Sequence, residues 1–165
     1  MKVRELMTEQ PQCCSPDTNL AVAAQLMWTN DCGVLPVAED GKLTGVITDR
    51  DICIALGTRD QTAAQTAVKD VATREVQTCR MNDDVATAMA TMRRAGVHRL
   101  PVVGDEGKLE GILALNDLVL AADHKRKGVA DDDVMATIKS LSQHRDGKTA
   151  EAERLKFPAI QVAVA

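Results

Sequence analysis

The stretches "GVITDRDI" (45–52) and "GILALNDL" (111–118) are two versions of one phrase. Each has a glycine, two apolar residues, a small residue, two variable positions, an aspartate and an apolar residue. The chain before them repeats as well, because a shift of 65 residues places "LPV" (35–37) on "LPV" (100–102), and one inserted residue then raises the shift to 66. So many ordered matches indicate a tandem duplication.

Each copy predicts the element order strand, helix, strand, strand, helix. A short strand is expected near 11–14 and again near 76–79. The helix that follows has apolar residues at helical spacing and an N-cap, Thr18 in the first copy and Asp83 in the second. A hairpin around an Asp-Gly turn comes next, and the inserted residue lengthens this turn in the second copy. The second helix of each copy is "DRDICIAL" (49–56) or "LNDLVLAA" (115–122).

The predicted organisation is repeat 1 at 1–56, a polar linker at 57–67, repeat 2 at 68–123, and a C-terminal helix and tail at 124–165. A helix is expected at about 132–145, because Val134, Ile138 and Leu141 share a face and acidic residues come first, as the helix dipole favours. The final "KFPAIQVAVA" (156–165) fits an edge strand, a partner contact or a disordered tail.

The size of each copy favours packing of one copy on the other. A unit of about 55–60 residues buries too little surface to be stable alone, so we expect the two to pack sheet against sheet. The second helices are apolar on nearly every face, and a short helix of that kind is normally covered on more than one side. This predicts a homodimer as well.

Composition narrows the function. No apolar run approaches the roughly 18–20 residues of a membrane span, and the N-terminus lacks the apolar core of a secretory signal, so a cytoplasmic protein with no membrane partner is expected. The net charge is −4 and the chain has one Trp, one Phe and no Tyr, which argues against nucleic-acid binding. The five cysteines form no CxxC pair and the three histidines are scattered, so neither a metal site nor a disulfide framework is predicted.

Thr48 and Asp51 in the first phrase have two interpretations. They fit a capping box, in which both side chains satisfy free N–H groups of a first helical turn. The same geometry suits a ligand, because a helix N-terminus attracts phosphate and a carboxylate can accept both hydroxyls of a ribose. In the second copy Ala114 cannot cap, yet Asp117 is present, which favours a role beyond capping.

At this point the sequence resembles the cystathionine-β-synthase (CBS) domain pair over about residues 1–123. The resemblance rests on the duplication, on "LPV" before the Asp-Gly turn and on the phrase G-h-h-(T/S)-x-x-D, where h is apolar. It implies an α/β fold in which two tandem repeats form one pseudo-twofold module, often dimerised. Such modules bind adenosine-containing ligands (AMP, ADP, ATP or S-adenosylmethionine) in the cleft between repeats and control a partner protein, with no cofactor required.

The resemblance also implies two sites, each built from both repeats. The first would combine Thr48, Asp51, Val76, Val97, His98, Arg99 and Pro101. The second would combine Gln12, Gly33, Val34, Pro36 and Asp117. The first resembles the nucleotide site in the γ subunit of the AMP-activated kinase, where a His-Arg pair before "LP" contacts phosphate. We therefore expect a phosphorylated nucleotide at the first site and adenosine-like binding, or none, at the second, which has no cation.

Two other functions stay open. One is a structural or protein-interaction module that has lost ligand binding. The other is an enzyme acting on a nucleotide, but no catalytic constellation is visible around His98, and His124 and His144 lie outside the repeats. We predict that the chain is not an enzyme.

Overall fold

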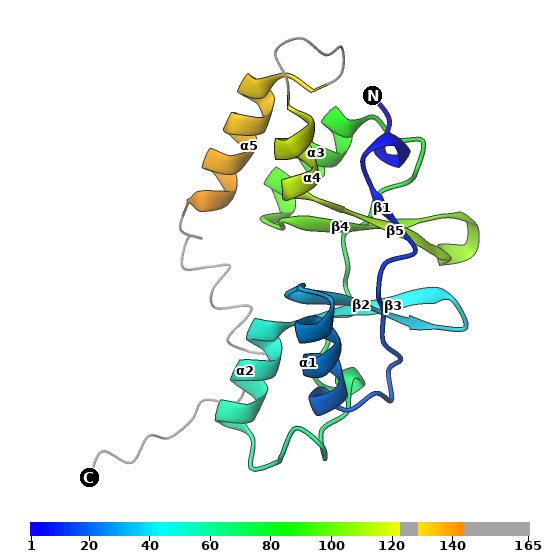
Figure 1. Ribbon diagram of the computed structural model, residues 1–165, viewed down its shortest axis with the longest axis vertical. Helices are drawn as coiled ribbons and strands as arrows, with labels where there is room; N and C mark the ends of the chain where they lie inside the picture. The colour runs from blue at the N-terminus through cyan, green and yellow to red at the C-terminus, as the bar shows by residue number, and fades with distance from the viewer. Residues whose placement is uncertain (123–128, 144–165) are drawn as a thin grey trace.

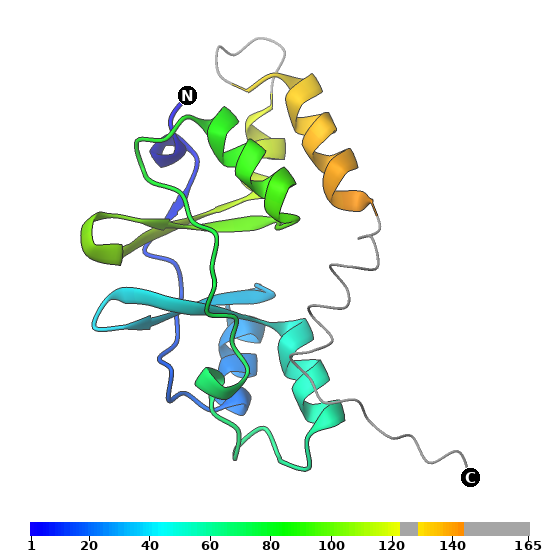
Figure 2. The same cartoon turned by 180° about the vertical axis from the view of Figure 1, so that it is seen from behind.

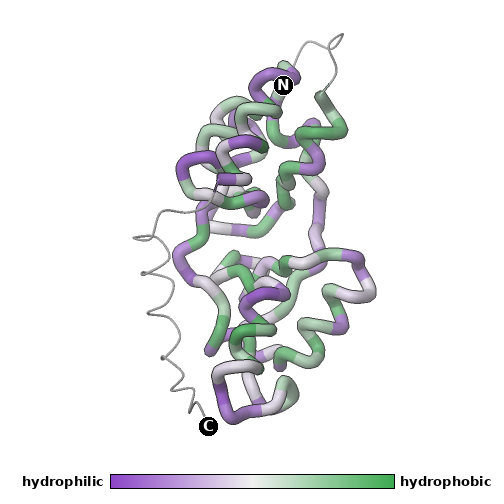
Figure 3. The backbone as a smooth tube through the Cα atoms, turned by 90° about the vertical axis from the view of Figure 1, so that its left-hand side faces the viewer, coloured by the Kyte–Doolittle hydropathy of each residue, from purple (hydrophilic) through white to green (hydrophobic). Residues whose placement is uncertain are grey.

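The computed structural model describes residues 1–122 and 129–143, and these form two stacked halves (Figures 1 and 3). The first half of the chain contributes η1 (Val3–Glu5), β1 (Thr8–Glu9), α1 (Leu20–Thr29), β2 (Val34–Glu39), β3 (Lys42–Thr48) and α2 (Asp49–Thr58). The second contributes η2 (Val68–Asp70), α3 (Val85–Ala95), β4 (Arg99–Val103), η3 (Asp105–Gly107), β5 (Leu109–Ala114) and α4 (Leu115–Ala121), followed by α5 (Asp131–Ser142). The two sheets face each other, with α1 and α2 outside one and α3 and α4 outside the other (Figure 1).

The two predicted hairpins are confirmed. β2 pairs with β3 and β4 with β5, both antiparallel. Asp40 and Gly41 have φ of 50° and 76°, the left-handed conformation that both central residues of a tight type I′ turn need. In repeat 2 the inserted residue turns this corner into the short helix η3. Each hairpin has a register shift at the same place, after Val37 and after Val102.

The prediction of a first strand at 11–14 and at 76–79 is wrong, because only Cys14 and Cys79 of these stretches form a β-bridge. Each segment crosses from one sheet to the other. Thr8 pairs with Ile112 in the sheet of repeat 2, and only Cys14 bridges to the sheet of repeat 1. In the second repeat Thr73 bridges to repeat 1, and Cys79 bridges back to repeat 2. The backbone hydrogen bonds of each segment are thus divided between two sheets, so few residues form regular strand on either. Figure 2 shows both segments passing from one half to the other.

The crossing segments explain the glycine that opens each quoted phrase. A Cβ atom on Gly45 would lie 2.9 Å from the carbonyl oxygen of Thr73, and one on Gly111 would lie 2.9 Å from that of Thr8. Real Cβ atoms do not approach backbone this closely, so both positions need glycine. The glycine that opens each phrase therefore marks the place where the crossing segment of the other repeat packs.

Two hydrophobic cores result, and each contains residues from the other repeat. Val3 and Met7, from the start of the chain, pack in the core of repeat 2. Val68 packs in the core of repeat 1. Val3 and Val68 occupy the same position in the duplication, and both are fully buried. The packing units therefore differ from the sequence repeats by one exchanged segment each.

The predicted N-caps are one residue too early. α1 begins after Asn19, whose side chain accepts from the N–H of Val22 at 2.9 Å, and α3 begins after Asp84. The Thr18 hydroxyl instead accepts from Ser15 N–H, and the Asp83 carboxylate accepts from the backbone N–H three residues before it. These side chains close the turn that precedes each helix, so the helix starts at the next residue.

The predicted C-terminal helix is present as α5, which ends at Ser142, and residues 144–145 of the prediction lie outside the described residues, as does the tail. Val134 is buried, and Ile138 and Leu141 pack against the core of repeat 2, as their shared face predicts. Three aspartates in the first turn suit the positive end of the helix dipole. No helix in residues 1–122 or 129–143 has the length and apolar character to span a membrane.

Candidate functional site

The N-terminus of α2 has a complete capping box. The Asp51 N–H donates to Thr48 Oγ1 at 3.1 Å, and Asp51 Oδ2 accepts from the Thr48 N–H at 3.0 Å and from the Thr48 hydroxyl at 2.7 Å. Within the described part of the chain, Asp51 Oδ1 accepts no further hydrogen bond, and the side chain is half-buried. The capping interpretation of Thr48 and Asp51 is confirmed, and it leaves one carboxylate oxygen for another partner.

The corresponding aspartate of repeat 2 also caps its helix. Asp117 Oδ2 accepts from the backbone N–H of Ala114 at 2.7 Å, although Ala114 has no side chain that could return a bond. Half of the box therefore survives without the threonine. The missing threonine is therefore no argument for a role of Asp117 beyond capping, because the N-cap residue donates through its backbone N–H whatever its side chain.

The starts of β2 and β4 lie against the second helix of their own repeat. The Gly33 carbonyl accepts from the Asp49 N–H at 3.1 Å, and the His98 carbonyl accepts from the Leu115 N–H at 2.8 Å. A Cβ atom on Gly33 would lie 2.9 Å from Asp49 Oδ2, so this position is held open by the absence of a side chain. The helix begins with an acidic residue in repeat 1 and an apolar residue in repeat 2.

Val34 pairs with Thr48 across the hairpin, and Arg99 pairs with Ala114. The side chains of His98 and Arg99 are exposed. The His98–Arg99 pair therefore lies at the start of β4, next to the α4 N-terminus of its own repeat.

The crossing segments carry Gln12 and Val76 past the two prolines of the predicted sites. The carbonyl of Pro36 accepts from the Cys14 N–H, and that of Pro101 accepts from the Cys79 N–H, both at 3.1 Å. Gln12 is exposed, with its amide donating to the Cys13 carbonyl, and Val76 is half-buried.

The structure places part of each predicted site at one strand. Val97 and His98 directly precede β4, and Arg99 and Pro101 lie on it. Gly33 directly precedes β2, and Val34 and Pro36 lie on it. Val76 and Gln12 lie on the crossing segments that bridge to these strands at Cys79 and Cys14. The aspartate assigned to each group, and Thr48 of the first site, belong to the helix of the opposite repeat. No hydrogen bond among the described residues joins these aspartates to their assigned groups, so the pairing across the repeats stays a prediction.

Two cavities lie elsewhere, along η2 and the second crossing segment. Their volumes are about 460 and 360 Å³, and Lys69, Ala72 and Arg74 line both. None of the predicted site residues lines either cavity. Sequence reasoning missed these basic residues because nothing in the repeat pattern marks them.

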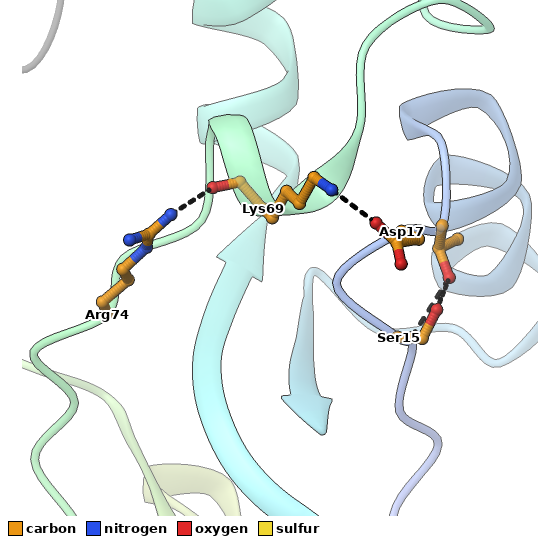
Figure 4. A network of polar contacts seen from close by, with 5 residues as sticks. Ser15, Asp17, Lys69 and Arg74 are labelled. Carbon is orange, nitrogen blue, oxygen red and sulfur yellow. Dashed lines mark hydrogen bonds and ion pairs between the residues drawn. The ribbon is translucent and has the colours of Figure 1, made fainter. Parts of the chain in front are cut away.

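The cations of these cavities are engaged by the protein itself (Figure 4). Lys69 Nζ lies 2.6 Å from Asp17 Oδ1, and Arg74 donates to the Lys69 carbonyl at 3.3 Å. The hydrogen bond to Asp17 raises the pKa of Lys69 above its ordinary value. Arg59 donates to the Asp70 carbonyl at 2.9 Å. The contacts of Asp17 and Arg59 hold η2 against repeat 1, and with the bond of Arg74 they explain the basic residues without a ligand.

The described residues contain no cluster of side chains able to hold a metal ion. All five cysteines are free, with Cys14 and Cys79 buried and Cys53 exposed. Burial raises the pKa of Cys14 to about 11, with the neighbouring Cys13 adding to the shift. Burial raises that of Cys79 to about 12, with Asp83 adding to the shift.

These pKa values predict the order of thiol labelling. At pH 8, Ellman's reagent should react at once with Cys53 and reach Cys14 and Cys79 only as the protein unfolds, because the thiolate is the reacting species. Since the folded pKa values are raised, the two thiols contribute stability below about pH 8.5, and this is lost as the pH rises through about 11 and 12. Cys53→Ser should remove the fast phase, and fast labelling of Cys14 in the native protein would contradict this expectation.

Comparison with known proteins defines the class. The CBS domain profile matches residues 3–58 and 68–124, and the chain belongs to the CBS domain family. The CBS domain-containing protein YhcV of Bacillus subtilis (strain 168) is 36% identical over 118 residues, covering 72% of this chain and 83% of the relative. The resemblance and the predicted α/β fold of two tandem CBS repeats are both confirmed.

Two further relatives are an enzyme that contains a CBS part and a CBS protein that was crystallised with a nucleotide. The inosine-5′-monophosphate dehydrogenase of Thermoplasma acidophilum is 32% identical over 105 residues, which are 64% of this chain but 20% of that enzyme, so the likeness is confined to its CBS part. The structure also resembles the crystal structure of CBSX2 in complex with AMP, with a TM-score of 0.64 and 26% sequence identity. The match covers 73% of this chain and 94% of the CBSX2 chain. CBS-pair proteins are generally regulatory, and CBSX2 was crystallised in complex with AMP.

Proposed function

We propose that this chain is a cytoplasmic regulatory module that binds an adenosine-containing ligand between its repeats and signals the bound state to a partner protein. The observation that carries this is the exchange of crossing segments. Gln12 and Val76 lie on stretches that run from one sheet to the other, where a ligand would contact both repeats. The AMP complex of CBSX2 supports a ligand of this type.

The first site is proposed for a phosphorylated nucleotide. The free oxygen of Asp51 would accept from the ribose hydroxyls, and the exposed Arg99 and His98 would hold phosphate through charge-assisted hydrogen bonds. Val76, Val97 and Pro101 would form aliphatic walls for adenine. The second site has Asp117 but no cation, and the Asp49 carboxylate beside Gly33 disfavours an anion there. An adenosine-like ligand without phosphate, or none, suits the second site.

Thermal unfolding of ligand-stripped protein with AMP, ADP, ATP and S-adenosylmethionine tests both parts of this proposal. The midpoint should rise with a nucleotide, because a ligand that binds only the folded state stabilises it. Arg99→Ala should reduce the rise given by AMP, and Arg94→Ala, which changes an exposed arginine of α3, should not. If none of the four ligands moves the midpoint, the module does not sense adenosine compounds.

A module without ligand is the second candidate. It is favoured by the finding that Asp51 and Asp117 both cap helices, which explains their presence without any ligand. In that case Asp51→Ala would lower stability, and the four ligands would change neither variant nor wild type.

Homodimerisation is proposed through the second helix of repeat 2. Leu120 is 86% exposed and Val119 is 43% exposed, and large apolar side chains gathered on a surface mark interaction sites. Sedimentation equilibrium should give a dimer for the wild type and a monomer for Leu120→Asp. Met135→Asp, at a half-exposed position on α5, is the control and should remain dimeric. A monomeric wild type across the micromolar range would contradict this assembly.

A further inference from the structure

The outer helices of the two repeats are covered unequally. In repeat 2, α5 packs against α3 and α4, and Arg93 of α3 donates to Thr137 Oγ1 of α5 at 2.7 Å. Thr137 is fully buried by this contact. In the described residues, no helix takes the corresponding place on α1 and α2 of repeat 1 (Figure 1).

The positions that α5 covers in repeat 2 are exposed in repeat 1. Trp28 is the counterpart of Arg93 in the duplication, and it is 88% exposed. Ala24 is exposed where its counterpart Met89 is 3% exposed and packed in the core of repeat 2. Ala24 and Trp28 are four residues apart on α1, as their counterparts are on α3, so each pair lies on one side of its helix.

On the second helix, Leu56 is 42% exposed, and its counterpart Ala122 packs against the core of repeat 2. We call Ala24, Trp28 and Leu56 the repeat 1 face. Tryptophan is highly buried on average in folded proteins, so a face built around the chain's single tryptophan calls for a covering segment.

The C-terminal segment of the same chain has the composition and reach to cover it. Residues 157–165, "FPAIQVAVA", contain no charged side chain. α5 ends at Ser142 on the same side of the molecule as α2 (Figures 1 and 2). The stretch from 143 to 157 spans up to about 45 Å when extended. A folded chain of 165 residues has a radius of gyration of only about 15 Å, so this stretch is long enough to reach repeat 1.

We propose that residues 157–165 dock on the repeat 1 face of their own chain, in the place that α5 takes on repeat 2. The molecule then has one C-terminal element on each half, and the internal pseudo-symmetry of the helical layers is completed.

Fluorescence of Trp28 tests this directly, because the chain has no other tryptophan. Acrylamide quenching is measured for the full chain, for Ile160→Asp and for Ile160→Val. The wild type and Ile160→Val should be protected, and Ile160→Asp should be quenched as strongly as the chain unfolded in urea. Met135→Gln, which changes an exposed apolar residue outside the repeat 1 face, should remain protected.

Unfolding midpoints establish that all four proteins are folded during the measurement. Equal quenching of the wild type and Ile160→Asp would overturn the proposal. Protection that disappears on dilution would also overturn it, because the covering segment would then come from a second copy.

Discussion

Replacing Asp51 with alanine is expected to abolish the stabilisation that a bound nucleotide gives to the protein. At a ligand concentration about a hundred times the dissociation constant, the wild type should gain about 2.7 kcal/mol of unfolding free energy. Asp51→Ala should gain none, because the carboxylate proposed to hold the ribose hydroxyls is gone. The measurement is the unfolding free energy from urea titrations with and without AMP.

The structure supplies matched controls for this experiment. Asp51→Ala also removes a helix cap, which costs about 0.5–2 kcal/mol without any ligand. Asp117→Ala removes a cap of the same kind from α4 and should keep the AMP effect. Thr48→Ala leaves repeat 1 with the alanine that repeat 2 has naturally at position 114, and it isolates the role of the hydroxyl. If Asp117→Ala rather than Asp51→Ala loses the AMP effect, the nucleotide does not bind at the proposed first site.

Val68→Ala is expected to destabilise the repeat to which Val68 does not belong in sequence. Its side chain is fully buried in the core around α1, and its backbone N–H donates to the Thr18 carbonyl at 2.8 Å. Removing two buried carbon atoms and leaving a cavity should cost about 2 kcal/mol. Hydrogen exchange followed by mass spectrometry should show the greatest loss of protection in α1, not in α3.

Val3→Ala is the reciprocal variant. Val3 is fully buried in the core of repeat 2, and its N–H donates to the Asp83 carbonyl at 3.0 Å. Its effect should therefore fall on α3. If Val68→Ala loosens α3 and Val3→Ala loosens α1, the segments are not exchanged in solution.

The elements that depend on local pattern could be predicted from the sequence, and the exchange could not. Alternation of apolar residues around an Asp-Gly turn specifies a hairpin locally, so the sequence predicts both hairpins and the structure confirms them. Residues 8–14 and 73–79 are too short to reveal which sheet each end joins, because edge pairing is decided by packing between distant parts of the chain. The one signal present was Gly45 and Gly111, which mark a close backbone approach without naming the partner.

The candidate site, like the fold, could be predicted from the sequence only where its features depend on local pattern. The positions of Asp51 and Asp117 in the first turns of α2 and α4 followed from the repeated phrase. The backbone bond of Asp117 to Ala114 did not, because the residue types at these positions do not reveal a bond made by a backbone N–H. The cavities beside Lys69 were missed because the segment that forms them lies against a different repeat from the one that its sequence suggests.

The exchange of crossing segments also bears on how a chain of this design can be divided. Cut within residues 57–67, the first fragment would keep β1, which pairs with β5, and would lack Thr73, which pairs with Val46. In each fragment the sheet would lack the crossing segment that pairs with it. It could regain this pairing only by accepting a segment from the other fragment or from a second copy of itself. A single repeat of this kind is therefore expected to form a domain-swapped dimer when expressed alone. The tandem chain corresponds to such a dimer joined end to end, so each half depends on a segment of the other half for its packing.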